Sequence, residues 1–260
     1  MKKLGFIGMG NMASAILNGM IQSHFMEGHQ ICAYDIVPSQ LDKIKTFGVE
    51  LCQNELAVVE NSEMIFVAVK PQVVEKVLLP LKEALKGKAL ISIVLGYDFD
   101  KYNSLLDSST RHIFVMPNTP AQVLEGMSLL EERHSLYNDE FAFTKQLFAS
   151  IGEVEVVPSH LMSVGGALSG CAPAYMYMVI EALADGAVKE GMPRTMAYKI
   201  ASQMMLGSGK MVLETNLHPG VLKDNVCSPG GSTIRGVETL EKGRMRSLFI
   251  EAITNTTHYK

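Results

Sequence analysis

Hydrophobic residues in the first part of the chain gather in short continuous runs separated by polar turns. The first run, residues 4–7, leads into a glycine-containing turn. Apolar residues then recur at helical spacing, at Met12, Ile16, Leu17 and Met20. Two later runs, residues 64–69 and 89–95, have the continuous apolar character of strands buried on both faces of a sheet. Strands that alternate with helices predict an α/β class with a mostly parallel, doubly wound sheet.

The same pattern predicts further strands and helices in alternation up to residue 157. Strands are expected at residues 30–35, 49–51, 112–116, 126–131 and 154–157. Helices are expected at residues 38–47, 54–61, 73–81 and 138–150. Ligands bind such sheets beyond the carboxyl ends of the strands. The residues expected at those ends are Gly8, Asp35, Lys70, Gly96 and Asn118.

Near Pro158 the strand signals stop and long helical stretches follow. They cover residues 161–191, 193–213, 217–225, 232–241 and 245–257. The chain therefore divides into residues 1–157 and an all-helical region, residues 158–260. The helices of this region are apolar on more than one face, so a single copy would expose much apolar surface. We expect the helical region to form the core of a homodimer, because closed symmetric pairing is the default arrangement.

Composition narrows the classes of function. The 260 residues are 47% hydrophobic and 19% charged, which is ordinary for a soluble protein. The net charge of −4 argues against nucleic acid or an anionic membrane as the main partner. No run approaches the roughly 18 uninterrupted apolar residues of a membrane span. The four cysteines and seven histidines show no metal-ligand spacing, so we expect reduced core thiols, no metal site and a cytoplasmic protein.

The turn Gly8-Met9-Gly10-Asn11-Met12-Ala13 is the first candidate binding site. Gly8 permits a tight turn, Gly10 lets the backbone approach a pyrophosphate, and Ala13 allows the helix to pack closely on the strand. The helix that begins here offers free N–H groups and a partial positive charge to phosphate. Glycine turns also join strands to helices for structural reasons alone. Because this turn lies between a strand and a helix, it predicts dinucleotide binding.

A carboxylate follows the second expected strand. Asp35 falls where an acidic residue binds the ribose 2′-hydroxyl of NAD, and it would repel the 2′-phosphate of NADP. No arginine follows within the next few residues. The alternative interpretation is an aspartate that caps a helix or a turn before Pro38. Taken alone, Asp35 favours NAD.

A proline- and glycine-rich stretch, residues 222–234, is the second candidate site. It delivers Ser232 and Thr233 to the start of a helix. A Ser/Thr helix cap is the alternative interpretation, which needs no ligand and contributes about 1 kcal/mol. A cap does not require the consecutive glycines 230 and 231, however, and these let backbone N–H groups converge on an anion. We therefore expect a carboxylate to bind here through charge-assisted hydrogen bonds.

Five motifs occur in an order that resembles the pyrroline-5-carboxylate reductase family over nearly the whole chain. They are Gly8–Ala13, Ala68–Pro71, Met116–Pro120, Leu168–Tyr175 and Leu222–Asp224 with Ser228–Thr233. The proline-glycine-glycine segment with its threonine is the most specific of them. The resemblance implies a Rossmann-type dinucleotide-binding domain, residues 1–157, followed by a helical substrate-binding and dimerisation domain, residues 158–260. It also implies rings of dimers, such as a homodecamer.

The resemblance further implies an activity and its site residues. A reduced nicotinamide would give hydride to the C=N carbon of 1-pyrroline-5-carboxylate and form L-proline, in the last step of proline biosynthesis. Cofactor contacts are implied at Ile7, Gly8, Met9, Gly10, Asn11, Met12, Asp35, Asn54, Ala68, Val69, Lys70, Pro71, Ile93, Val94, Leu95 and Asn225. Substrate contacts are implied at Ser228, Gly230, Gly231, Ser232 and Thr233. The Thr233 hydroxyl matches the group that hydrogen-bonds the ring nitrogen, and it is the catalytic candidate.

Cofactor preference and two other functions stay open. The family generally favours NADPH, so the resemblance implies NADP, with NAD as the alternative that Asp35 favours. A 3-hydroxyacid dehydrogenase of similar plan would need a lysine acid/base on the helical region, where Lys189 and Lys210 are the candidates. A non-catalytic NAD(P)-sensing module would keep the first site and lose the second. The intact stretch 228–233 argues against this module.

Overall fold

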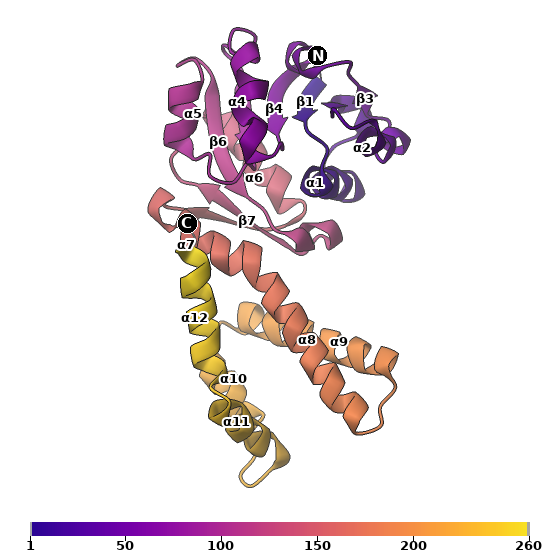
Figure 1. The fold of residues 1–260 in the computed structure, drawn as a ribbon, viewed down its shortest axis with the longest axis vertical. Helices are drawn as coiled ribbons and strands as arrows, with labels where there is room; N and C mark the ends of the chain where they lie inside the picture. Colours follow the sequence, from indigo (N-terminus) through magenta and orange to yellow (C-terminus); the bar gives the residue numbers. More distant parts are fainter. Residues whose placement is uncertain (1, 259–260) are drawn as a thin grey trace. The chain divides into compact units, whose positions relative to one another are not determined.

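A computed structural model describes residues 2–258, and the chain divides into two compact units, residues 1–170 and 171–260. The described strands all lie in the first unit (Figure 1). They are β1 (Lys2–Ile7), β2 (Ile31–Tyr34), β3 (Glu50–Leu51), β4 (Ser62–Val67), β5 (Ala89–Ser92), β6 (Arg111–Met116), β7 (Gly126–Glu131) and β8 (Gly152–Val157). They form one sheet in the order β3-β2-β1-β4-β5-β6-β7-β8. Every pairing is parallel except β6 with β7, so the predicted α/β fold with a mostly parallel sheet is confirmed.

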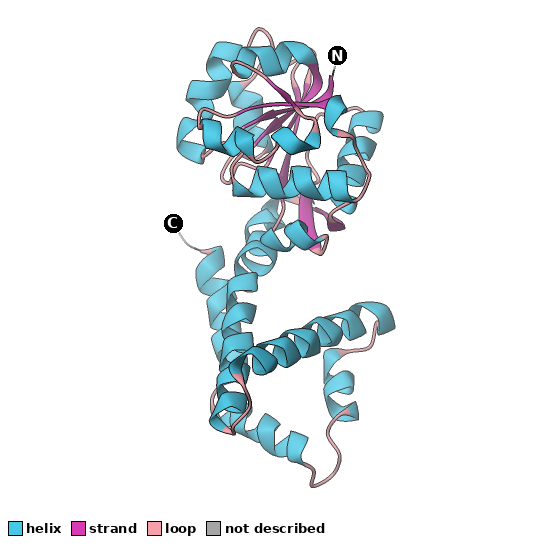
Figure 2. Cartoon of the chain, turned by 90° about the vertical axis from the view of Figure 1, so that its right-hand side faces the viewer, coloured by secondary structure: helices cyan, strands magenta, loops and turns pink. Residues whose placement is uncertain are grey.

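Helices cover both faces of this sheet (Figure 2). Those of the first unit are α1 (Asn11–Gln22), α2 (Pro38–Asp42), α3 (Glu55–Asn61), α4 (Val74–Leu78), α5 (Phe99–Leu105), α6 (Asn138–Ala149) and α7 (Met162–Gly166). Alternate residues of each central strand enter different cores. On β4, Phe66 packs in the core under α1 and α6, and Ile65 packs in the core under α3, α4 and α5. Burial on both faces explains why these strands are continuous apolar runs.

The first compact unit extends past the last strand. Met162, in α7, packs with Phe114 and Leu129 of the sheet. A π-helical turn, Ala167–Cys171, follows α7. The Asn118 side chain donates from Nδ2 to the carbonyl oxygen of Ser169 in this turn (3.0 Å), and its Oδ1 accepts from Met127 N–H (2.9 Å). Asn118 is therefore a structural link from the end of β6 to both β7 and the π-helical turn.

Several element boundaries differ from the sequence-based predictions. The helix expected at 38–47 stops at Asp42, and a separate 3₁₀ turn, Lys45–Phe47, completes the segment. The runs 64–69 and 89–95 end as strands at Val67 and Ser92. Helix α5 was not predicted at all. It begins at a side-chain cap, in which Asp98 accepts a hydrogen bond from Lys101 N–H (3.0 Å).

The second unit is helical over its described residues. Its helices are α8 (Ala172–Lys189), α9 (Arg194–Thr215), α10 (Pro219–Asn225), α11 (Ser232–Lys242) and α12 (Met245–Thr257). Few of their residues are buried, and Met178, Leu213 and Ile250 are each at least two-thirds exposed, at 68%, 73% and 67%. This confirms that a single copy leaves much apolar surface uncovered. The expected core thiols are only partly confirmed, because Cys32 is buried whereas Cys171 is exposed.

One helical stretch, Ser159–Lys189, is long and apolar enough to cross a membrane by length and composition, with a mean hydropathy of 1.3. No such stretch is expected from the sequence, because polar residues interrupt every apolar run. A mean hydropathy taken over 18 consecutive residues can stay high despite those interruptions. Only 11% of those 18 residues is buried in the single chain. Core helices of soluble proteins can have the same length and composition.

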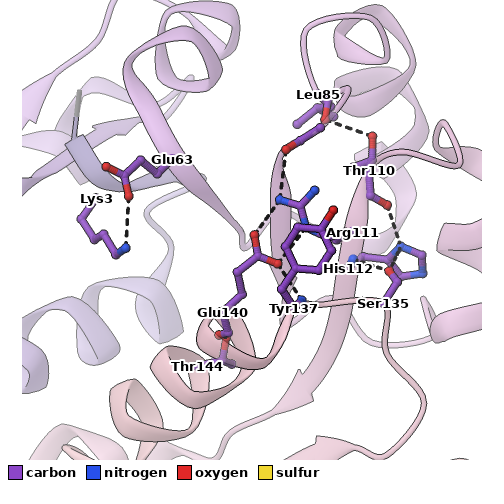
Figure 3. A network of polar contacts seen from close by, with 11 residues as sticks. Lys3, Glu63, Leu85, Thr110, Arg111, His112, Ser135, Tyr137, Glu140 and Thr144 are labelled. Atoms are coloured by element: carbon purple, nitrogen blue, oxygen red, sulfur yellow. Dashed lines mark hydrogen bonds and ion pairs between the residues drawn. The ribbon is translucent and has the colours of Figure 1, made fainter.

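An ion pair of low exposure joins the start of β6 to the first turn of α6 (Figure 3). Arg111 donates from Nε and Nη2 to the two carboxylate oxygens of Glu140, at 2.8 and 2.6 Å. The ring of Tyr137 lies 4.2 Å from the guanidinium carbon, and the Glu140 carboxylate also accepts from Tyr137 N–H (2.9 Å). The hydrogen bond to Glu140 raises the pKa of Arg111. The pair is 14% and 13% exposed.

Replacing Glu140 with glutamine is expected to lower the free energy of unfolding by about 2–3 kcal/mol, because it leaves a largely buried guanidinium without its counter-charge. Urea unfolding measures this change. Asp100→Asn is the matched control, since Arg133 makes the same two-pronged contact with Asp100 (both 2.8 Å) on an exposed surface. The control should change stability little. Equal losses of unfolding free energy in the two variants would contradict the argument that burial makes the Arg111–Glu140 pair the stronger one.

Candidate dinucleotide and substrate site

The glycine turn connects β1 to α1 beneath a pocket at the carboxyl ends of the strands. Gly8 has φ = +91°, in the left-handed region that favours glycine, and its N–H donates to the carbonyl of Tyr34 (2.9 Å). A Cβ on Gly8 would lie 2.6 Å from the carbonyl oxygen of Ala68. Ala68 N–H in turn donates to the carbonyl of Ile7 (2.9 Å). The turn and the segment after β4 are thus packed backbone to backbone.

The pocket has a volume of about 270 Å³ and is formed by three segments that follow β1, β4 and β5. Its lining residues are Gly10, Asn11, Met12, Ala13, Ala68, Val69, Lys70, Pro71, Ile93, Val94 and Leu95. All but Ala13 are predicted cofactor contacts, so ten of the sixteen meet in one place.

Phosphate fits the start of α1. No side chain caps this helix, and its first internal hydrogen bond runs from Ser14 N–H to the carbonyl of Gly10 (2.9 Å). The N–H groups of residues 11–13 therefore lack partners within the helix. A Cβ on Gly10 would have no atom within 4 Å, so the space over this residue is open. An open cradle with free amides at a helix N-terminus suits a pyrophosphate.

Ile7, Gly8 and Met9 lie under the pocket rather than in its lining. Met9 is fully buried, and its N–H donates to Oδ2 of Asp35 at 2.6 Å. The other carboxylate oxygen of Asp35 accepts from Val37 N–H (2.8 Å), as in the turn role considered as an alternative. Asn54 is the N-cap of α3, where its Oδ1 accepts from Ala57 N–H (2.8 Å).

A buried hydrogen-bonded pair supports the wall formed by residues 93–95. Ser92, the last residue of β5, accepts from Val94 N–H at 3.1 Å and pairs with the Tyr102 hydroxyl at 2.6 Å. Both side chains are fully buried, and burial raises the pKa of Tyr102. The tyrosine therefore stays neutral and holds the turn that leads into the wall. Sequence reasoning missed both residues, although a serine ending an apolar strand was a visible signal.

The second candidate site, residues 228–233, forms a turn that opens α11. Gly230 has φ = +70°, and Gly231 donates its N–H to the carbonyl of Ser228 (3.0 Å). The N-cap of α11 is Gly231, with no side-chain cap hydrogen bond. Ser232 and Thr233 are thus the first helical residues and do not cap it, which removes the alternative raised from the sequence. The free donors are the amides of the first turn, starting at Ser232, together with the exposed hydroxyls.

The remaining predicted residues lie on helices of the second unit. Asn225 ends α10 and is exposed. Lys189 ends α8 and Lys210 lies within α9, and both are exposed. Among the described residues, no group of three or more His, Cys, Asp or Glu side chains is arranged to hold a metal ion.

A larger hollow of about 670 Å³ lies elsewhere in the first unit. Its lining includes Lys3 and Glu63, at the amino ends of β1 and β4, which form an ion pair at 3.1 Å (Figure 3). Dinucleotides bind at the carboxyl ends of such strands. The smaller pocket above the glycine turn is therefore the candidate cofactor site.

Comparison with known proteins covers both units. The family described as "NADP oxidoreductase coenzyme F420-dependent" matches residues 3–96, and the one described as "Pyrroline-5-carboxylate reductase dimerisation" matches residues 159–260. The pyrroline-5-carboxylate reductase of Escherichia coli K12 is 42% identical over 255 residues, covering 97% of this chain and 95% of that protein. The chain belongs to the pyrroline-5-carboxylate reductase family. The Arabidopsis thaliana family member is 41% identical, over 96% of this chain and 91% of its own length.

Solved structures of the family have the same fold. The Plasmodium falciparum pyrroline carboxylate reductase with NADP bound is 30% identical, with a TM-score of 0.88 over 98% of this chain and 95% of that one. The Coxiella burnetii pyrroline-5-carboxylate reductase is 31% identical, with a TM-score of 0.90 over 98% and 96%. These matches confirm the Rossmann-type sheet followed by a helical dimerisation region.

Proposed function

We propose that this protein reduces 1-pyrroline-5-carboxylate to L-proline with NAD(P)H. The observation that carries the proposal is the 42% identity to a pyrroline-5-carboxylate reductase over 97% of the chain. That span includes both the pocket above the glycine turn and the 228–233 turn. The pocket supports the cofactor part of the proposal, because its free amides and its open space over Gly10 fit a pyrophosphate.

The reaction needs little acid–base chemistry from side chains. When bound, the reduced nicotinamide supplies a hydride to the C=N carbon of the imine. The protonated imine is already an electrophile, and the C=N π electrons become the lone pair of the product amine. The protein has to align the nicotinamide ring with the imine ring and exclude water. Positioning therefore supplies most of the rate enhancement.

Each site segment has a proposed part in that alignment. The first-turn amides of α1 hold the pyrophosphate, and residues 68–71 and 93–95 form the walls beside the cofactor. The first-turn amides of α11 bind the substrate carboxylate, favoured by the partial positive charge of the helix N-terminus. Ser228, Gly230 and Gly231 shape that turn, and the Thr233 hydroxyl orients the ring N–H. Asn225 and Asn54 stay proposed cofactor contacts.

A spectrophotometric assay tests the proposed reaction. We expect NADPH or NADH to be oxidised when pyrroline-5-carboxylate is added. The fall in absorbance of the reduced nicotinamide measures this oxidation. A hydroxyacid with the oxidised cofactor should give no reduction, and the reduced cofactor alone should be stable. Turnover of the hydroxyacid, or binding of the cofactor without any turnover, would contradict the proposal.

We also propose that residues 158–260 form a substrate-binding and dimerisation domain, following residues 1–157 as the dinucleotide domain. The exposed apolar face of Ser159–Lys189 lies inside the segment that matches the dimerisation family, which favours a second copy over lipid as its cover. Dimers that assemble further, as in a homodecamer, and a cytoplasmic location complete the proposal. A stable monomer by light scattering at micromolar concentration would contradict the dimer.

A further inference from the structure

The wall formed by residues 93–95 begins where the sheet stops. Ile93 still donates its N–H to the carbonyl of Val67 in β4 (3.1 Å), whereas the next amide, of Val94, donates to the side-chain oxygen of Ser92 (3.1 Å). Val94 is buried, so its N–H depends on that oxygen rather than on water. The position of the wall beyond Ile93 therefore depends on where the Ser92 hydroxyl points.

The hydroxyl of Tyr102, on α5, fixes that direction. It lies 2.6 Å from Oγ of Ser92, and both side chains are fully buried. A serine hydroxyl has three staggered positions around its Cα–Cβ bond. In the observed one, Ser92 meets both the phenol oxygen and the Val94 N–H. Without the phenol oxygen, the Ser92 hydroxyl would lose one of these two partners and would be free to turn away from Val94.

Tyr102 can hold Ser92 because α5 is itself anchored to β6 and β7. Glu131 of β7, which is 1% exposed, accepts from Phe99 N–H in the first turn of α5 (3.0 Å). His112 of β6 has its Nε2 3.2 Å from the Phe99 carbonyl oxygen, so this nitrogen carries a proton and donates it. Burial lowers the pKa of His112, and its ring lies 5.8 Å from that of Tyr102. The tyrosine is therefore fixed by buried contacts with two strands that do not line the pocket.

We propose that Tyr102 is a positioning residue for the cofactor, because through Ser92 it holds the 93–95 wall against which the dinucleotide binds. The proposal rests on the proposed dinucleotide-dependent reductase function. Tyr102 itself does not line the pocket, so its effect passes through the wall. It should act on cofactor affinity and leave imine binding, proposed at the 228–233 turn, unchanged.

Tyr102→Phe tests the proposal in the full-length protein, because it removes the hydroxyl and keeps the ring. Dissociation constants for NADH and NADPH are measured from nicotinamide fluorescence, and kcat and KM are measured for cofactor and imine. Both dissociation constants should rise about 3- to 10-fold, the size expected for the loss of one hydrogen bond. The KM for the cofactor should rise by the same factor. The KM for the imine, and kcat at saturating cofactor, should each stay within about twofold of the native values.

Ser92→Ala is the second variant, since it removes the acceptor of the Val94 N–H directly. It should weaken the binding of both cofactors by a similar factor. The double variant should bind no more weakly than Ser92→Ala alone, because the two hydroxyls act in series on one amide. Additive losses of affinity in the double variant would overturn the proposal. If Tyr102→Phe did not fold, native affinity in Ser92→Ala would overturn it equally.

Thr110→Val is the matched control for the loss of a buried hydroxyl. Thr110 is 2% exposed and its Oγ1 donates to the carbonyl of Leu85 (3.0 Å; Figure 3), and neither residue lines the pocket. This variant should lose stability to urea and keep native affinity for both cofactors. Native affinities in Tyr102→Phe, or equal weakening in Thr110→Val, would overturn the proposal. A native protein that binds both cofactors without reducing the imine would count against the proposed function only, since the comparison of affinities needs no imine.

Discussion

Replacing Thr233 with alanine is expected to lower kcat for imine reduction by roughly 10–100-fold, the usual size of an orienting or acid–base contribution. The hydroxyl is exposed at the first turn of α11, and no described side chain caps that helix. It is therefore available to the substrate, whose carboxylate is proposed to bind the neighbouring amides. An unshifted hydroxyl is a weak acid, so its expected part is to orient the ring N–H or to pass a proton through water. The affinity for the reduced cofactor should stay nearly unchanged.

Steady-state kinetics at saturating cofactor, with cofactor binding measured separately, check this prediction. Thr239→Ala is the matched control, because Thr239 lies on the same helix and donates its hydroxyl to the carbonyl of Arg235 (3.0 Å). It should keep full turnover. Thr233→Ser should recover most of the rate, since it restores the hydroxyl and loses only a methyl group. Full turnover in Thr233→Ala would remove Thr233 from the chemistry.

The fold was predictable because burial leaves a simple pattern in this chain. Residues of β4 alternate between two apolar cores, so the run reads as a strand covered on both sides. The glycines that follow β1 mark the turn. Helix α5 was less visible, because its start depends on the cap formed by Asp98 and its buried tyrosine, Tyr102, is one of few apolar contacts. Strand ends were also misplaced, because Ala68, Val69 and residues 93–95 stay apolar after leaving the sheet to line the pocket.

The sequence predicts those parts of the site that depend only on residue type and on the order of the segments along the chain. The pocket above the glycine turn contains ten predicted contacts because each segment follows a strand of one parallel sheet. The Asp35–Met9 bond spans 26 residues and depends on which way a side chain turns, which no spacing in the sequence records. The cap of α11 was equally undecidable, because Gly231 and Ser232 are both acceptable N-caps. In the structure, Gly231 is the N-cap.

Two alanine substitutions in the glycine turn should separate folding from cofactor binding. Gly8→Ala forces a side chain into φ = +91° and places a Cβ 2.6 Å from the Ala68 carbonyl oxygen. It should lower the free energy of unfolding by at least about 2 kcal/mol and disrupt the pocket. Gly10→Ala meets no atom within 4 Å, and its backbone, at φ = −64° and ψ = −178°, suits alanine. Because alanine is a poorer N-cap than glycine, the cofactor-free stability of this variant should fall by no more than about 1 kcal/mol.

Cofactor affinity should nevertheless fall by roughly 100-fold or more in Gly10→Ala, because a methyl group occupies the space through which a pyrophosphate approaches the backbone. Thermal unfolding without cofactor and fluorescence titration with NADH and NADPH measure the two effects. Gly48→Ala is the control for backbone strain, since it has φ = +75° with open space around its Cβ position, and it should cost about 1–2 kcal/mol and keep cofactor binding. Native affinity in Gly10→Ala would mean that no pyrophosphate lies over this turn. Such a result would remove the pocket at the ends of β1, β4 and β5 as the cofactor site, however well the variant folds.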